Sequence, residues 1–303
     1  MDISSFDLPV PPQNHFPSPY ERPTVPLVIA HNIAMKDGAF IATFVYSSLN
    51  ASETIASWAH KPPVLMIHGN GEEHGIFGPT IDAAVTAGYT VIALDSRAQG
   101  KSTRGTEPLT YELMAADALY VLDTLGAQKA HLVGFSDGGI EVLLMARDYP
   151  QRAASLLAIG ANLTPEGVID DGWDLVGNAQ INRDWNEFWE DDNPADERHA
   201  PLEVDTGLLY CSPQEALISA ELLQLMVDHP HIDAQSLTTI TCPACIMAGE
   251  HDCILPEETQ AIAQNIKGSR LVIVPNMDHS LPKHAPADVS CEMLINLLLT
   301  QDY

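Results

Sequence analysis

The chain has 303 residues, of which 46% are hydrophobic and 18% are charged, a balance typical of a globular protein rather than a disordered one. Its 14 basic and 41 acidic residues give a net charge of −27, which repels nucleic acid and anionic membrane surfaces. We therefore expect neither nucleic acid nor a membrane as a partner, and no apolar run approaches the ~20 residues of a membrane-spanning helix.

Residues 1–24 contain many prolines and little periodicity, which predicts an extended arm. Two runs rich in β-forming residues between positions 25 and 48 flank Asp37-Gly38, a hairpin signal. Short apolar strands then alternate with helices. Strands are predicted at 64–67, 90–94, 131–134, 154–159, 244–248 and 271–274, and helices at 79–88, 111–125, around Ile140 to Leu144, at 213–227, 256–266 and 286–299. This alternation predicts an α/β fold with a mostly parallel sheet and helices on both faces.

The alternation is interrupted at residues 163–235, about 70 residues that are too many for a simple loop. This stretch contains Trp173, Trp185 and Trp189, an acidic run, and an amphipathic helix at 213–227. We predict a core domain made of residues 1–162 and 236–303, with residues 163–235 as a helical cap.

The five cysteines, an odd number, are too few for a disulfide scaffold in a chain of this length. Cys242-Pro-Ala-Cys245 matches the C-x-x-C pattern of redox and zinc sites. A redox site would place the first cysteine at a helix start, and a zinc site needs a second pair of ligands. The motif instead leads into an apolar run, which predicts reduced strand cysteines. We expect no metal and no cofactor.

The start of the chain lacks the basic and apolar segments of a secretory signal. A cytoplasmic location is therefore the expectation. The oligomeric state is left open by the sequence.

Gly134-Phe-Ser136-Asp-Gly138 matches G-x-S-x-G, with a predicted strand before it and a predicted helix after it. In this context the sharp turn presents the serine hydroxyl above the sheet, and the glycines let the strand and helix backbones approach each other. We predict that Ser136 is a nucleophile.

A serine hydroxyl needs a base to take its proton, and in this arrangement the acid and the histidine follow the serine along the chain. Asp252 follows the predicted strand 244–248, with Glu250 as the alternative acid. His279 follows the last predicted strand, with His284 as the competitor. We predict a catalytic triad of Ser136, Asp252 and His279.

Two backbone N–H groups must stabilise the oxyanion that forms on attack. One is expected from Asp137, the residue after the nucleophile. The other is expected from Asn70 in the His68-Gly-Asn-Gly71 turn after the strand 64–67.

Together these motifs resemble the α/β-hydrolase superfamily, from about residue 25 to the end except for the insertion. Asp95-Ser-Arg97-Ala-Gln-Gly100-Lys-Ser102 is similar to the family's D-x-R-x-x-G-x-S loop. The resemblance implies the α/β-hydrolase fold and a cap over the active site at residues 163–235.

Three segments resemble the biphenyl-hydrolase-like or valacyclovir hydrolase branch, namely residues 134–140, 159–162 and 267–271. That branch cleaves α-amino-acid esters, and its Asp after the nucleophile receives the substrate ammonium group, which implies this role for Asp137. Phe135 departs from the branch, which has Trp at this position.

The predicted function is the hydrolysis of small soluble carboxylic esters through an acyl-enzyme, with Trp173, Trp185 and Trp189 as candidate pocket residues. Peptidase, lactonase, thioesterase and C–C bond hydrolase chemistry use the same triad. A lipase with a lid, or a small-molecule receptor without turnover, are further alternatives.

Overall fold

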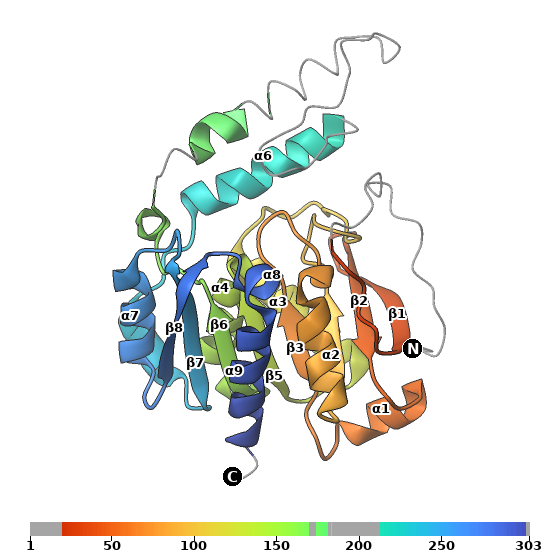
Figure 1. The fold of residues 1–303 in the computed structure, drawn as a ribbon. Helices are drawn as coiled ribbons and strands as arrows, with labels where there is room; N and C mark the ends of the chain where they lie inside the picture. The colour runs from red at the N-terminus through yellow and green to blue at the C-terminus, as the bar shows by residue number, and fades with distance from the viewer. Residues whose placement is uncertain (1–19, 170–173, 181–182, 184–212, 301–303) are drawn as a thin grey trace.

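The computed structural model describes residues 20–169, 174–180, 183 and 213–300 (Figure 1). Eight strands form one sheet in the order β1-β2-β4-β3-β5-β6-β7-β8. The strands are β1 Leu27–Ala34, β2 Phe40–Tyr46, β3 Val64–Ile67, β4 Val91–Leu94, β5 Ala130–Phe135, β6 Ala153–Ile159, β7 Ala244–His251 and β8 Arg270–Asp278. The predicted α/β class with one central sheet is confirmed.

Strand direction in the sheet is mostly parallel, as the alternation of strands and helices predicts. β2 pairs antiparallel with β1 and with β4, whereas the remaining neighbours pair in parallel. β2 is therefore the one strand of this sheet that runs against the others. Every residue of β3 and β4 is buried, as is typical of parallel strands covered on both faces.

Helices cover both faces of the sheet. They are α1 Ala51–Ser57, α2 Gly78–Thr86, α3 Tyr111–Leu125, α4 Asp137–Asp148, α6 Pro213–Asp228, α7 Pro256–Asn265, α8 Leu281–His284 and α9 Pro286–Leu298. α3, α4 and α7 pack one hydrophobic core against one face, and α2 and α9 pack a second core against the other (Figure 1). This arrangement leaves the ends of the parallel strands free to carry a site.

α3 shows how local sequence sets an element. The Thr110 side chain accepts a hydrogen bond from the Leu113 N–H, and Gly126 ends the helix with a φ of 86°. The hydroxyl satisfies a donor that the first helical turn leaves unpaired, and glycine adopts the left-handed conformation without a Cβ penalty. Both boundaries agree with the prediction for residues 111–125.

Several features differ from the sequence-based prediction. β7 and β8 continue to His251 and Asp278, beyond the apolar runs from which they were predicted. α1 was not predicted, although Asn50 and Glu53 form a reciprocal capping box at its start. The longer strands bring the chain directly to Asp252 and His279.

The structure describes part of the predicted cap: α6, with η3 (Pro165–Gly167) before it and η5 (Ala234–Thr239) after it. Asn70, in the loop after β3, donates from its Nδ2 to the carbonyl oxygen of Leu222 on α6 at 3.1 Å. This contact places α6 over the carboxyl end of β3. Arg104 and Glu221 form an ion pair at 2.7 Å that attaches α6 to the core.

The three candidate pocket residues Trp173, Trp185 and Trp189 lie outside the described residues. None of the helices in the described ranges combines the length and the apolarity needed to cross a membrane.

Candidate active site

Ser136 occupies the turn between β5 and α4 with φ 53° and ψ −118°. A positive φ strains a residue with a Cβ, and such strain is typical of functional positions. A Cβ on Gly134 would overlap the carbonyl oxygen of Gly138, and a Cβ on Gly138 would overlap that of Ile67. The two glycines therefore permit the close strand and helix backbones that create the turn.

Ser136, His279 and Asp252 form a continuous chain of hydrogen bonds. His279 Nε2 lies 3.0 Å from Ser136 Oγ, and His279 Nδ1 lies 2.6 Å from Asp252 Oδ1. The serine follows β5, the acid follows β7, and the histidine follows β8. The structure thus brings together the three residues that were predicted as a triad.

The His279 ring is held between neighbouring groups. Its centroid lies 5.0 Å from that of the Phe135 ring. Gly160 has a φ of +58°, and a Cβ at this position would lie 2.8 Å from His279 Cε1. A larger side chain at position 160 would require the imidazole or the backbone of residue 160 to shift.

Asp252 sets the protonation of His279. Burial lowers the pKa of the His279 imidazole, but the hydrogen bond and negative charge of Asp252, together with Cys253, raise it above its ordinary value. Burial alone would raise the pKa of Asp252. The hydrogen bond and charge of His279 and the N–H groups of Ile254 and Gly249 have a larger opposite effect, so the pKa of Asp252 lies below its ordinary value. Asp252 is therefore an ionised partner that favours the imidazolium form.

The alternative acid and base make other contacts. Glu250 is exposed, and its Oε2 accepts from the Asn276 N–H at 2.8 Å. His284 Nδ1 lies 2.9 Å from Asp278 Oδ1, in an exposed pair. Neither residue joins the hydrogen-bond chain to Ser136.

The loop after β3 passes beside Ser136. A Cβ built on Gly69 would lie 3.0 Å from Ser136 Cβ, and the Gly138 N–H donates to the His68 carbonyl oxygen at 3.1 Å. The loop that carries Asn70 is therefore tied to the start of α4, which carries Asp137. The two predicted oxyanion donors lie on adjacent segments.

Buried polar groups fix this loop in place. Asp95 Oδ1 accepts from the His74 backbone N–H at 3.0 Å and lies 2.7 Å from His74 Nδ1. The Ser96 N–H donates to His68 Nε2 at 2.9 Å, and His68 Nδ1 lies 2.7 Å from the Gly69 oxygen. Such bonds hold the backbone of this loop in one orientation. An oxyanion site requires donors that are preorganised in this way.

The Asp137 side chain is only 3% exposed. Its Oδ1 accepts from the Tyr111 hydroxyl at 2.8 Å, and its Oδ2 accepts from Asn70 Nδ2 at 2.9 Å. Burial raises the pKa of Asp137 to about 6, although both bonds and the charge of His279 oppose that rise. In the described part of the chain no Lys or Arg forms an ion pair with this carboxylate.

Several acidic and thiol groups near the site were not singled out by the sequence analysis. Burial raises the pKa of Glu72 to about 7, and its Oε2 is buried with no partner among the described residues. Burial and the charge of Asp137 raise the pKa of Glu141, one helical turn away on α4. Cys253 directly follows Asp252. This adjacency is the only sequence signal that could have placed it near the site.

The C-x-x-C cysteines lie away from this site, at the start of β7. Cys242 and Cys245 are free. Burial raises the pKa of Cys242 to about 11 and that of Cys245 to about 12. A redox pair needs a thiolate near neutral pH, so these values disfavour that role.

Comparison with known proteins identifies relatives of this chain. The model of the alpha/beta hydrolase fold family matches residues 62–197. The serine hydrolase BPHL of Homo sapiens is 30% identical over 220 residues, which cover 70% of each chain. The 3-oxoadipate enol-lactonase 1 of Acinetobacter baylyi is 26% identical over 207 residues, 64% of this chain and 72% of the relative.

Among solved structures, a thermophilic esterase from Thermogutta terrifontis has a TM-score of 0.63. It is 22% identical in sequence, and the match covers 89% of this chain and 97% of the esterase. At this level of identity the likeness establishes the fold alone.

We expect Asp252→Asn to lower the pKa of His279 by about one unit or more. Asparagine removes the negative charge that favours the imidazolium, whereas burial of the ring persists and favours the neutral form. A pH titration of the histidine ring protons by NMR measures the change. His131, whose pKa burial lowers to about 4, serves as the control and should not move. An unchanged or raised pKa of His279 in the variant would contradict the electrostatic coupling.

Proposed function

The chain belongs to the α/β-hydrolase family of serine hydrolases, and on this premise we propose that it is a cytoplasmic hydrolase of small soluble carboxylic esters. The observation that carries the proposal is the chain of hydrogen bonds from Asp252 through His279 to Ser136, of 2.6 and 3.0 Å. A hydroxyl in contact with a base, which is itself oriented by a carboxylate, is the arrangement that acyl transfer needs.

In the proposed acylation step, Ser136 Oγ attacks the ester carbonyl carbon while His279 Nε2 accepts the hydroxyl proton. The resulting imidazolium is stabilised by Asp252, which remains ionised. The negative charge on the carbonyl oxygen would be held by the N–H groups of Asn70 and Asp137, each such donor contributing about 3–4 kcal/mol. His279 then gives its proton to the departing alkoxide, and the acyl group remains on Ser136.

In the proposed deacylation step a water molecule takes the place of the alcohol. His279 accepts a proton from the water, whose oxygen attacks the acyl carbon. Collapse of this second intermediate returns the proton to Ser136 Oγ and releases the carboxylic acid. Because His279 must be neutral to accept either proton, activity is expected to fall as the pH drops below the pKa of its imidazole.

The substrate class extends to cyclic esters. A lactone carries the same acyl carbon and differs only in that its alcohol stays attached after ring opening. The similarity to an enol-lactonase supports including lactones in the substrate panel. Peptides, thioesters and C–C bonds next to a carbonyl belong in the same panel, because one triad serves all of these reactions.

The Asp137 carboxylate supports a narrower form of the proposal, a preference for esters that carry a free α-amine. This carboxylate is buried next to the nucleophile, and its two described partners, Asn70 and Tyr111, are neutral donors. Burying a charge without a counter-charge is costly. A substrate ammonium group would supply that counter-charge, and hydrogen bonds to charged groups contribute about 1.5–3 kcal/mol.

Ser136→Ala is expected to lower ester turnover by a factor on the order of 10⁶, because among the described residues no other hydroxyl takes part in the hydrogen-bond chain to His279. The variant should also lose labelling by a fluorophosphonate probe. Ser290→Ala on α9, away from the triad, serves as the control that retains both properties. Full labelling of a folded Ser136→Ala protein would remove Ser136 as the nucleophile.

The amine preference predicts that the wild-type enzyme cleaves an aminoacyl ester at least about ten-fold faster, as kcat/KM, than its N-acetyl analogue. A ten-fold preference corresponds to ~1.4 kcal/mol. Asp137→Asn should abolish the preference, because the amide keeps the shape of the side chain and loses the charge.

The N-acetyl ester is the internal control, since it reports damage to the catalytic step itself. Equal rates of the wild-type enzyme on the two esters would leave the enzyme a general carboxylesterase and Asp137 a structural residue.

A further inference from the structure

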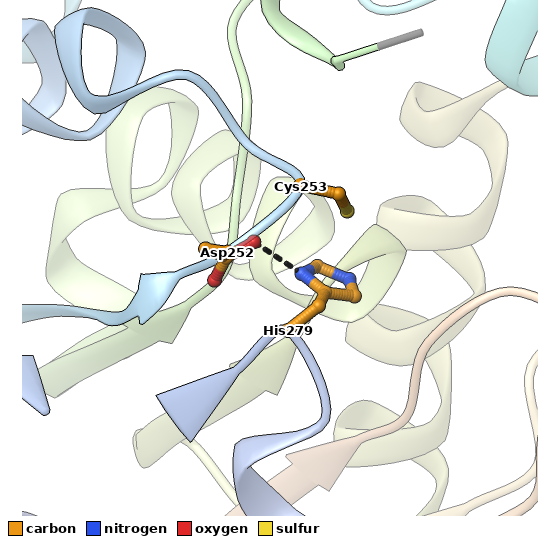
Figure 2. A group of neighbouring side chains, drawn as sticks. All are labelled: Asp252, Cys253 and His279. Carbon is orange, nitrogen blue, oxygen red and sulfur yellow. Dashed lines mark hydrogen bonds and ion pairs between the residues drawn. The ribbon is translucent and has the colours of Figure 1, made fainter. Parts of the chain in front are cut away.

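Cys253 lies at the edge of the proposed triad. It follows Asp252 in the segment between β7 and α7, and Figure 2 shows its sulfur directed toward the His279 ring. One ligand atom from each of Asp252, Cys253 and His279 can be chosen so that all three lie within 4.8 Å of one another. Asp252 is buried, and the other two side chains are partly exposed, so the group can be reached from solvent.

The donor set of this cluster suits one class of ligand. A carboxylate oxygen, an imidazole nitrogen and a thiolate sulfur together match borderline and soft divalent ions such as Zn²⁺ and Cd²⁺, whereas Mg²⁺ and Ca²⁺ prefer oxygen ligands alone. Zn²⁺ binds these atoms at about 2.0–2.3 Å in tetrahedral geometry, which places two ligands about 3.3–3.8 Å apart. Ligand atoms that lie up to 4.8 Å apart must approach by about 1.0–1.5 Å to reach these distances, and rotation of the Cys253 side chain can move its sulfur in that direction. Asp252 Oδ1 and His279 Nδ1, which lie 2.6 Å apart, must instead separate.

The backbone around the cluster is held on both sides. Asp252 Oδ1 accepts from the Ile254 N–H at 2.9 Å. The Cys253 carbonyl oxygen accepts from the Ile169 N–H at 2.7 Å, and Val168 pairs with Ile254 in an isolated β-bridge. The ligands therefore start from ordered positions, so little conformational freedom remains to be lost when an ion binds.

Charge favours a cation at this position. Asp252 contributes a carboxylate oxygen to the cluster. The chain as a whole carries a net charge of −27, which raises the local concentration of divalent cations around the molecule.

We propose that Asp252, Cys253 and His279 bind a zinc-class divalent ion, and that this ion reversibly inhibits the enzyme. The inhibitory part of the proposal rests on the proposed function, whereas the binding part does not. On binding, the Cys253 thiol loses its proton to solvent and its sulfur donates an electron pair to the ion. No group is oxidised or reduced, and a chelator reverses the step.

Inhibition follows whichever imidazole nitrogen binds the ion. An ion on Nε2 takes the lone pair that would accept the Ser136 proton. An ion on Nδ1 displaces the proton shared with Asp252 and breaks the 2.6 Å hydrogen bond that orients the ring. The remaining proton then resides on Nε2, which can no longer act as a base. The proposed site is therefore an off-switch and not a cofactor site.

Binding is tested with Cd²⁺ alone, whose bond to a thiolate produces a charge-transfer band in the ultraviolet. We expect the band to saturate at one equivalent in the wild-type protein, to disappear in Cys253→Ala, and to need at least ten-fold more Cd²⁺ in His279→Ala. Cys291→Ala, which removes an exposed thiol on α9, is the matched control and should keep the band. A band that persists in Cys253→Ala, or that His279→Ala leaves unchanged, overturns the site.

Inhibition is tested with Zn²⁺ on ester turnover, each variant being compared with its own rate after treatment with a chelator. The wild-type enzyme and Cys291→Ala should be inhibited by sub-millimolar Zn²⁺ and spared by Mg²⁺ at the same concentration. Cys253→Ala should need at least ten-fold more Zn²⁺ for half-inhibition. Equal sensitivity of Cys253→Ala overturns the inhibitory site. Cd²⁺ binding by a protein that cleaves no ester would instead refute the proposed function and leave the metal site standing.

Discussion

The 3.0 Å contact between His279 Nε2 and Ser136 Oγ joins two residues that are 143 positions apart in the chain. The contact exists because β5, β6, β7 and β8 run parallel, so that the chain leaves each strand at the same edge of the sheet. Ser136 has a positive φ at the point where α4 approaches β3 closely. Apolar packing on both faces holds the sheet together. The sheet in turn sets the distance between Ser136 and His279 at its edge.

Much of this arrangement could be predicted from the sequence. Apolar runs bounded by turn residues marked the parallel strands, and the Thr110 and Gly126 signals marked both ends of α3. The G-x-S-x-G turn placed Ser136 between a strand and a helix, and position relative to later strands singled out Asp252 and His279. These predictions depend on local backbone chemistry and on chain order, which a single sequence displays.

Other features depend on contacts between distant segments, which a sequence does not display. The burial of Asp137 beneath Tyr111 and Asn70 required the loop after β3 to lie against α4. The position of Cys253 beside His279 required the ends of β7 and β8 to meet, and both strands continue past their apolar runs into polar residues. Polar strand ends show no hydrophobic periodicity, so the predicted strands 244–248 and 271–274 end before the observed ones do.

The central claim is that Ser136 carries the acyl group between the two halves of the reaction. Mass spectrometry of the protein, quenched with acid during turnover of a p-nitrophenyl ester, tests this claim most directly. The account predicts a mass increase of one acyl group, located on the peptide that contains Ser136. An acyl group on another residue, such as Cys253, would contradict it, as would a burst of p-nitrophenol from a chain that stays unmodified at Ser136.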